Sequence, residues 1–313
     1  MAFSGQIKST TTAKNIIQEA LELLGAVSEG ELANSAQEAS LLRTLNNLCV
    51  AWQSDGLNLF SVTYYYIFLE ADRFKYRIPD PTTRIATGVE RNFTAAAAVE
   101  TATSIDVEEE VPSNHDTVGV LLEDLTMFWS TIISAVDKTI IMNDSLPDDV
   151  IEGAQVYTYE DSVITRPMKT LSGHVYQQKQ ASIPMDHLSR EGYETLTNKR
   201  AKGIPLQFYY DPQVTYGDVY IWPTPSRNDN LMELHVQRQL DTAVNVANDV
   251  EYPAEWFLPL ATNLAYVSSA KYGVPRFDYL RLEALADKYY TMAKDFDFEW
   301  GTSLEFSPDR RGE

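Results

Sequence analysis

Cysteine is nearly absent from this 313-residue chain, and long apolar runs are absent altogether. The one cysteine, Cys49, cannot form an internal disulfide, which suits assembly in a reducing cytoplasm. No run of about 18 uncharged apolar residues occurs, and the opening MAFSGQIKSTTTAK lacks the apolar core of a signal peptide. The sequence therefore predicts no membrane segment and no export by that route.

Catalytic signatures are also missing. The sequence contains no HExxH, CxxC, GxSxG, P-loop or GxGxxG pattern, and its four histidines have no metal-ligand spacing. The paired acids Asp148 and Asp149 lie in an expected turn, where aspartate bonds its own backbone. We therefore expect a protein that is not an enzyme and needs no cofactor or metal.

Basic residues are scarce relative to acids, with 25 against 45 and a net charge of −20. Residues 90–160 alone hold 15 acids and 2 bases. This balance argues against sequence-specific DNA binding, because lysine and arginine supply most of the affinity for phosphate. Two interpretations of Glu108, Glu109 and Glu110 stay open. They face a lumen through which DNA slides without sticking, or they form a solvated rim on an outward-facing module.

Amphipathic helices are expected near both ends of the chain. Thr11 or Thr12 can cap a first helix that ends at Gly25, and Asn34 with Gln37 resembles a capping box for a second. The apolar face of that second helix consists of Leu41, Leu42, Leu45, Leu48, Cys49 and Trp52.

The C-terminal pair of helices is expected to begin near Pro253 and near Pro275. The apolar stripe of the first comprises Trp256, Phe257, Leu260, Ala261, Leu264, Ala265 and Val267. That of the second comprises Phe277, Leu280, Leu285, Ala286, Tyr289, Met292 and Phe296. A helical hairpin alone leaves its stripe in water, so we expect both pairs to pack together, with these stripes forming the core.

Residues between the two helical pairs read as β-structure. Within 90–160, short alternating runs broken by turn residues predict five or six strands of a small barrel or sandwich, with a hairpin connection at Asp137. A second β region contains QFYYD, DVYIWP and LMELHVQRQL, separated by turn-rich linkers. Residues 166–203 read as a partly extended arm, with a short helix within SIPMDHLSREGYETL that begins near Pro184 or Asp186.

The predicted fold is α+β, with a discontinuous helical bundle formed by the N- and C-terminal segments and inserted antiparallel β-domains. The sequence divides into helical segments 1–62 and 251–297, a β-hairpin region with its arm at 63–89 and 161–250, the acidic insertion 90–160, and a tail 298–313.

Several of these segments, in this order, resemble the head-to-tail adaptor proteins of short-tailed bacteriophages, also called tail accessory or packaged-DNA-stabilising factors. The resemblance lies in IIQEALELLGAV, AWQSDGLNLF and YPAEWFLPLATNLAYVSSAKYGV, and in the β-hairpin region GIPLQFYYDPQVTYGDVYIWPTP with LMELHVQRQL. It covers roughly residues 12–60 and 163–295, with residues 90–160 as an extra module.

This resemblance implies a virion protein of the neck, assembled in the host cytoplasm as a ring of identical subunits, usually twelve. Its implied partners are the portal protein, the tail nozzle or tail tube protein, and genomic DNA that passes through without specific binding. It also implies that the C-terminal segment reaches the portal. By position we assign that contact to Phe298, Trp300 and Phe306, although packing on the chain's own helices stays open.

Lys199, Arg200 and Lys202 form the only compact basic cluster. They contact passing DNA or a neighbouring subunit, or they lie in a solvated loop. An alternative for the whole chain is a peripheral virion protein that binds a carbohydrate or a capsid component through its inserted β-module.

Overall fold

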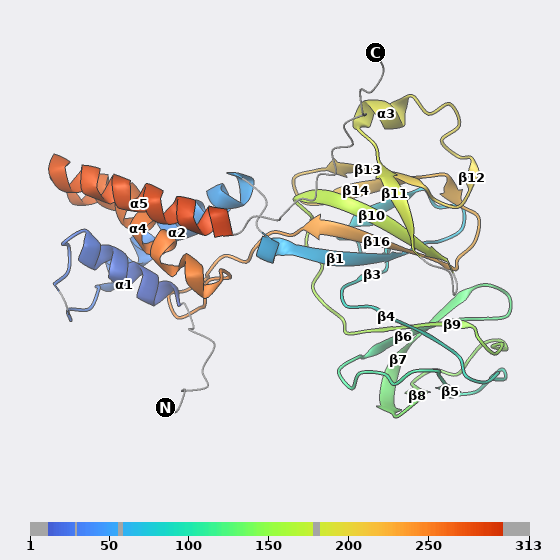
Figure 1. Ribbon diagram of the computed structural model, residues 1–313. Helices are drawn as coiled ribbons and strands as arrows, with labels where there is room; N and C mark the ends of the chain where they lie inside the picture. Colours follow the sequence, from blue (N-terminus) through green and yellow to red (C-terminus); the bar gives the residue numbers. More distant parts are fainter. Residues whose placement is uncertain (1–11, 29, 56–58, 178–181, 297–313) are drawn as a thin grey trace, which may run out of the picture. The chain divides into compact units, whose positions relative to one another are not determined.

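The computed structural model describes residues 12–28, 30–55, 59–177 and 182–296. It is an α+β protein, as the sequence predicts, and it divides into two compact units. The helical unit includes the chain up to Ser61 and from Leu240 onward, and the β unit spans Val62–Gln239 (Figure 1). Residues 240–250, which the sequence pattern grouped with the β region, thus belong to the helical unit.

The helices of the helical unit begin and end close to the residues that the sequence indicates. They are α1 (Ala13–Leu23), α2 (Ser35–Asp55), α4 (Phe257–Tyr272) and α5 (Arg276–Phe296), with 3-10 turns η1 (Leu59–Ser61) and η2 (Ala254–Trp256). The Thr12 side chain accepts from the N–H of Asn15 at the start of α1. Asn34 and Gln37 exchange side-chain to backbone hydrogen bonds of 2.9 and 3.0 Å, so the capping box is confirmed.

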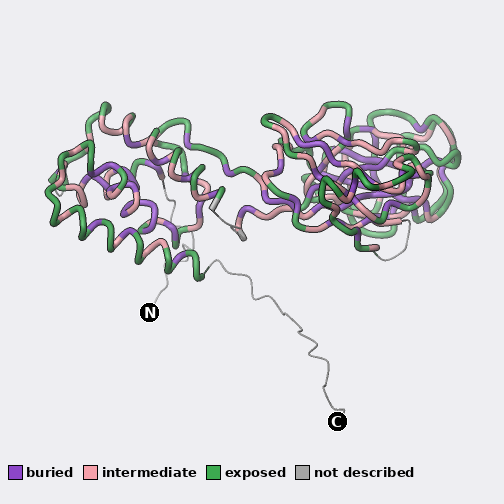
Figure 2. Tube along the Cα trace, turned by 90° about the horizontal axis from the view of Figure 1, so that it is seen from above, coloured by how far each residue is buried: buried purple, intermediate pink, exposed green. Residues whose placement is uncertain are grey.

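One hydrophobic core joins helices from both ends of the chain. It contains Ile16, Ile17 and Leu21 of α1, Leu41, Leu45 and Cys49 of α2, and Leu260, Ala261, Leu264 and Ala265 of α4. Aromatic rings of Trp52, Tyr252, Trp256 and Tyr290 pack together at one part of this core. Figure 2 shows buried and exposed stretches alternating along the helices, as one-sided packing requires.

The stripe expected to bury α5 is largely wrong. Its buried residues are Leu282, Ala286 and Ala293, of which only Ala286 belongs to the predicted set. The other predicted members are half-buried or exposed, and Phe277, Leu280, Met292 and Phe296 are among the most exposed large apolar side chains. Periodicity identified this helix correctly but could not choose which of its apolar sides faces the core.

The β unit contains an eight-stranded sheet in the order β2-β14-β13-β11-β10-β16-β1-β3. The strands are β1 (Val62–Phe68), β2 (Lys75–Ile78), β3 (Ile85–Ala86), β10 (Lys169–Gln177), β11 (Ile183–His187), β13 (Gln207–Pro212), β14 (Gly217–Trp222) and β16 (Asn230–Gln237). All pairs are antiparallel except β11 with β13. A separate parallel pair joins β12 (Lys202–Gly203) to β15 (Thr224–Pro225). The inserted β-structure is therefore not purely antiparallel.

One side of this sheet carries the apolar core of the β unit. Tyr65 and Ile67 of β1 pack there with Met232, Leu234 and Val236 of β16, which share a side because strand residues alternate. The intervening residues of the same strands point to the opposite side. That opposite side carries the polar cluster described below.

The arm predicted for residues 166–203 differs from the structure. Its first part forms the regular strands β10 and β11, and the helix is the short α3 (Arg190–Glu194), which begins after Ser189 rather than near Pro184 or Asp186. The Ser189 hydroxyl accepts from the N–H of Gly192 and caps this helix. Pairing with β10 holds Ile183 and Pro184 extended, and this pairing is absent from any local pattern.

The acidic insertion forms a six-stranded sheet in the order β4-β9-β6-β7-β8-β5. Its strands are β4 (Glu90–Phe93), β5 (Ser104–Asp106), β6 (Thr117–Leu121), β7 (Met127–Val136), β8 (Thr139–Met142) and β9 (Gln155–Tyr159). Thr94 bridges Val107, so the chain just beyond β4 and β5 brings the two edges of the sheet together around an apolar core. Asp137, with φ of 53°, lies in the tight β7–β8 connection that the sequence predicts.

Candidate functional sites

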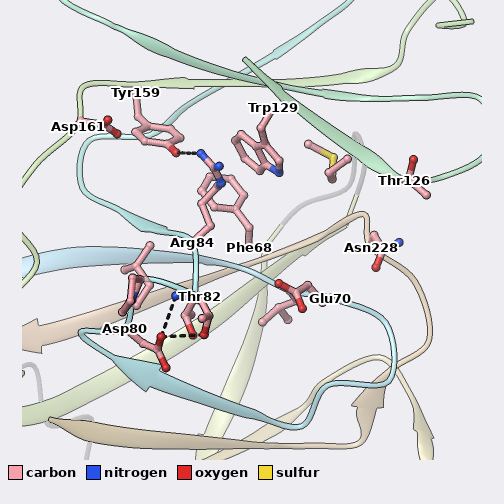
Figure 3. A pocket seen from close by; sticks show the side chains of 15 residues that line it. Phe68, Glu70, Asp80, Thr82, Arg84, Thr126, Trp129, Tyr159, Asp161 and Asn228 are labelled. Atoms are coloured by element: carbon pink, nitrogen blue, oxygen red, sulfur yellow. Dashed lines mark hydrogen bonds between the residues drawn. The ribbon is translucent and has the colours of Figure 1, made fainter. Parts of the chain in front are cut away.

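A pocket of about 610 Å³ lies where the eight-stranded sheet meets the inserted module (Figure 3). Aromatic residues Phe68, Trp129 and Tyr159 line it together with the charged side chains of Glu70, Asp80, Arg84 and Asp161. A volume of this size matches a small organic ligand. Phe68 comes from the sheet, whereas Trp129 and Tyr159 come from the insertion.

Arg84 joins the two parts of the β unit at this pocket. Its Nη1 donates to the Tyr159 hydroxyl at 2.8 Å, and its guanidinium lies 4.3 Å from the centre of the Trp129 ring (Figure 3). Phe68 packs edge-on against the same indole with a centroid distance of 4.6 Å. These contacts already engage the Trp129 ring, so we assign it a structural role as a wall of the pocket.

Two similar turns contribute threonines to this pocket. Asp80 accepts from the N–H and the hydroxyl of Thr82, and Asp124 does the same with Thr126. These hydrogen bonds to the carboxylate lower the pKa of both aspartates. Lowered values keep both groups ionised, which suits them to hold a turn and makes them poor general acids.

A second polar cluster lies on the side of the eight-stranded sheet opposite its apolar core. Glu233 and His235 are two residues apart on β16, and His174 on β10 is the register partner of Glu233. Ligand atoms of these three residues all lie within 4.8 Å of one another, which makes them the one group of this kind in the described part of the chain. Sequence spacing missed this cluster because β10 and β16 meet only in the folded sheet. The alternation Glu233-x-His235 was the available local signal.

The predicted basic cluster lies in and beside the loop after α3. Lys199 pairs with Glu194 at 2.5 Å and lies 5.0 Å from the centre of the Tyr193 ring. Lys202 pairs with Asp72, and the Arg200 guanidinium lies 5.6 Å from the centre of the Phe74 ring. These contacts favour a structural role for the three basic residues, in which they hold the loop in place, rather than a role as a phosphate-binding patch.

Glu108, Glu109 and Glu110 are exposed in the segment that follows β5. The backbone of Glu108 accepts from Lys138, and the backbone of Glu109 exchanges hydrogen bonds with Asn92. These contacts fix the backbone of Glu108 and Glu109. The predicted portal residues Phe298, Trp300 and Phe306 lie outside the described residues.

Cys49 is buried in the helical core. It is 5% exposed, and burial raises the pKa of its thiol to about 12, so the reactive thiolate is suppressed near neutral pH. This agrees with its position on the apolar face of α2.

None of the helices in the described ranges is long and apolar enough to cross a membrane. Comparison with known proteins gives no assignment, since no family model and no curated protein matches the chain.

Proposed function

We propose that the chain is a structural head-to-tail adaptor of a short-tailed phage virion. In this proposal identical subunits, twelve as in the resembling family, form a ring that joins the portal to the tail nozzle or tube. The ring helps to retain packaged DNA and to conduct it during ejection. Helices from both ends of the chain act as one discontinuous bundle that packs against neighbouring copies.

Apolar surface left uncovered on α5 is the observation that carries this proposal. Phe277 is 79% exposed, Met292 58% and Phe296 78%. Leu285, Tyr289, Met292 and Phe296 follow one another at spacings of four, three and four, so they line one side of the helix. A contiguous apolar surface on an otherwise acidic chain is typical of a protein interface. We assign the contact with a second copy of the chain to this α5 stripe.

Electron microscopy and light scattering of the full chain, alone and with purified portal, test the proposal. We expect rings on the portal and weakened ring formation in Met292→Glu, because a charge within a buried interface costs more than it gains. Thr291→Glu is the matched control, since it adds the same charge to an exposed neighbour about 100° around the helix. Unattached monomers at high concentrations of both proteins would rule out the adaptor function.

The tail is tested separately. Replacing Phe298, Trp300 and Phe306 together by serine is expected to abolish portal binding while rings of the chain alone persist. Rings that still dock would assign the portal contact elsewhere. Loss of solubility instead would indicate that these aromatics pack on the chain's own helices.

A peripheral ligand-binding role is the second candidate, and the pocket between the sheet and the insertion favours it. Its aromatic wall and its carboxylates are chemically suited to a carbohydrate or to a polar loop of a capsid component. Saturation-transfer NMR with a panel of oligosaccharides tests this role. This role would be favoured over the adaptor function if the chain bound an oligosaccharide, lost that binding in Asp161→Asn, and did not bind the portal.

A further inference from the structure

Strands β10 and β16 are neighbours in the eight-stranded sheet (Figure 1). Their pairing brings metal-ligating side chains together. His174 on β10 lies opposite Glu233 on β16, and His235 follows Glu233 on the same side. Tyr64 and Tyr66 on β1 are the register partners of His235 and Glu233 on the other flank. The cluster is therefore surrounded by regular strands, which hold ligands more rigidly than loops do.

Distances in this cluster are close to those of a tetrahedral metal site. Zn²⁺ binds nitrogen and oxygen ligands at about 2.0–2.2 Å, so neighbouring ligand atoms lie roughly 3.3 Å apart. Nε2 of His235 and Oε1 of Glu233 are 3.2 Å apart. All three ligand atoms lie within 4.8 Å of one another, so one ion can approach all of them.

His174 also has a nitrogen that the described contacts leave unexplained. Its Nδ1 is buried and has no hydrogen-bond partner among the described residues. Buried polar atoms normally have a partner, and those without one call for a specific reason such as a bound ion. Coordination through Nδ1 would satisfy this atom.

The surrounding residues position the ligands. Oε2 of Glu233 accepts from the Tyr176 hydroxyl at 3.2 Å, and Oε1 faces Nε2 of His235. The Tyr64 ring packs edge-on against His235 with a centroid distance of 4.3 Å. Hydrogen bonds and packing of this kind orient metal ligands and raise affinity.

We propose that His174, Glu233 and His235 bind one divalent first-row transition ion, with Zn²⁺ the best match to two imidazoles and one carboxylate. Three protein ligands leave a fourth position for water or for a donor from a partner. The ion ties β10 to β16 across the side of the sheet that lacks the main core. This site does not depend on the adaptor function.

Calorimetric titration of the untagged, chelator-treated full chain with Zn²⁺ tests the site. We expect one ion per chain with a dissociation constant below about 10 μM. His174→Gln and His235→Gln are each expected to weaken binding at least about tenfold. His187→Gln is the matched control, because His187 is exposed on β11 and outside the cluster, and it should bind as the unaltered chain does.

A second measurement needs no variant and therefore cannot fail through misfolding. Diethyl pyrocarbonate modifies accessible imidazoles, and mass spectrometry locates the modified residues. Zn²⁺ is expected to protect His174 and His235 while His187 reacts as before. The site would be overturned by the absence of saturable binding, by an affinity in both cluster variants equal to that of the unaltered chain, or by modification of His174 and His235 that does not change with Zn²⁺. An ordinary His235–Glu233 hydrogen bond would then remain.

Discussion

The side-chain amide of Asn46 donates a hydrogen bond to the backbone carbonyl of Ala243, 2.9 Å away and 197 residues later in the chain. A second bond of this kind runs from the Tyr252 hydroxyl to the carbonyl of Cys49 at 3.3 Å. Both connect α2 with the segment that leads into α4. These bonds join two segments of the helical unit that the whole β unit separates in the sequence. Neither segment contains a complete core by itself.

Asn46→Ala is expected to lower the free energy of unfolding by about 1 kcal/mol, since it removes the bond to Ala243. Asn47→Ala is the matched control, because Asn47 is exposed on the same helix. Both changes gain the same helix propensity, so their difference isolates the hydrogen bond. Denaturant titration followed by circular dichroism measures it. Equal effects of the two substitutions would mean that the Asn46 bond contributes nothing.

Gly119→Ala is expected to destabilise the β unit by about 1–3 kcal/mol, because overpacking forces neighbours to move. An added Cβ would lie 2.3 Å from an atom of the Trp129 ring, with which Gly119 pairs across β6 and β7. Gly203→Ala is the control, since the nearest atom to its Cβ is 3.4 Å away. Thermal unfolding measures both.

Trp129→Leu provides the second arm of that experiment. Once the indole is gone, Gly119→Ala should cost much less, because the two substitutions share one contact. A cost that stays unchanged in the Trp129→Leu background would place the strain at another neighbour of Gly119.

Cys49 is expected to react with a disulfide reagent at pH 8 only when the helical unit opens. The raised pKa and the low exposure of the thiol both suppress the reactive thiolate. Absorbance should show a slow reaction in buffer and a fast one in denaturant, with one thiol per chain. Rapid, complete reaction of the native chain would contradict burial of α2 in the helical core.

Asp80→Asn is expected to lower the melting temperature by an amount that depends on pH. The pKa of Asp80 is lower in the folded chain than in the unfolded chain, because the Thr82 N–H and hydroxyl bond the carboxylate. Its contribution is thus complete above the unfolded pKa of about 3.9 and is lost as the pH falls through the folded value. Melting curves from pH 6 to pH 2 should converge for the two proteins.

A neutral substitution nearby provides the reference for this pH series. Ser162→Ala removes a 2.8 Å hydrogen bond with Thr87 and no charge. Its effect on the melting temperature, relative to the unaltered chain, should not change through the same window. A pH-independent difference for Asp80→Asn would show that the Thr82 bonds do not favour the ionised carboxylate.

Local chemistry explains which elements the sequence predicts well. Thr12, Asn34 and Gly273 mark helix ends because each satisfies or terminates the backbone within a few residues. The Asp137 turn is equally local, since the backbone there must adopt a positive φ between two strands. Such features need no information from distant parts of the chain.

The sequence by itself determined the α+β class, the helix caps, most strands of the insertion and the concentration of acidic charge in residues 90–160. These follow from periodicity and from composition, which are properties of neighbouring residues. Only the tertiary structure decided that α5 buries Leu282 rather than Phe277, that Ile183 extends beside β10, and that His174 meets Glu233. Each of these depends on contacts between residues far apart in the chain, and a pattern read along one segment cannot contain its partner.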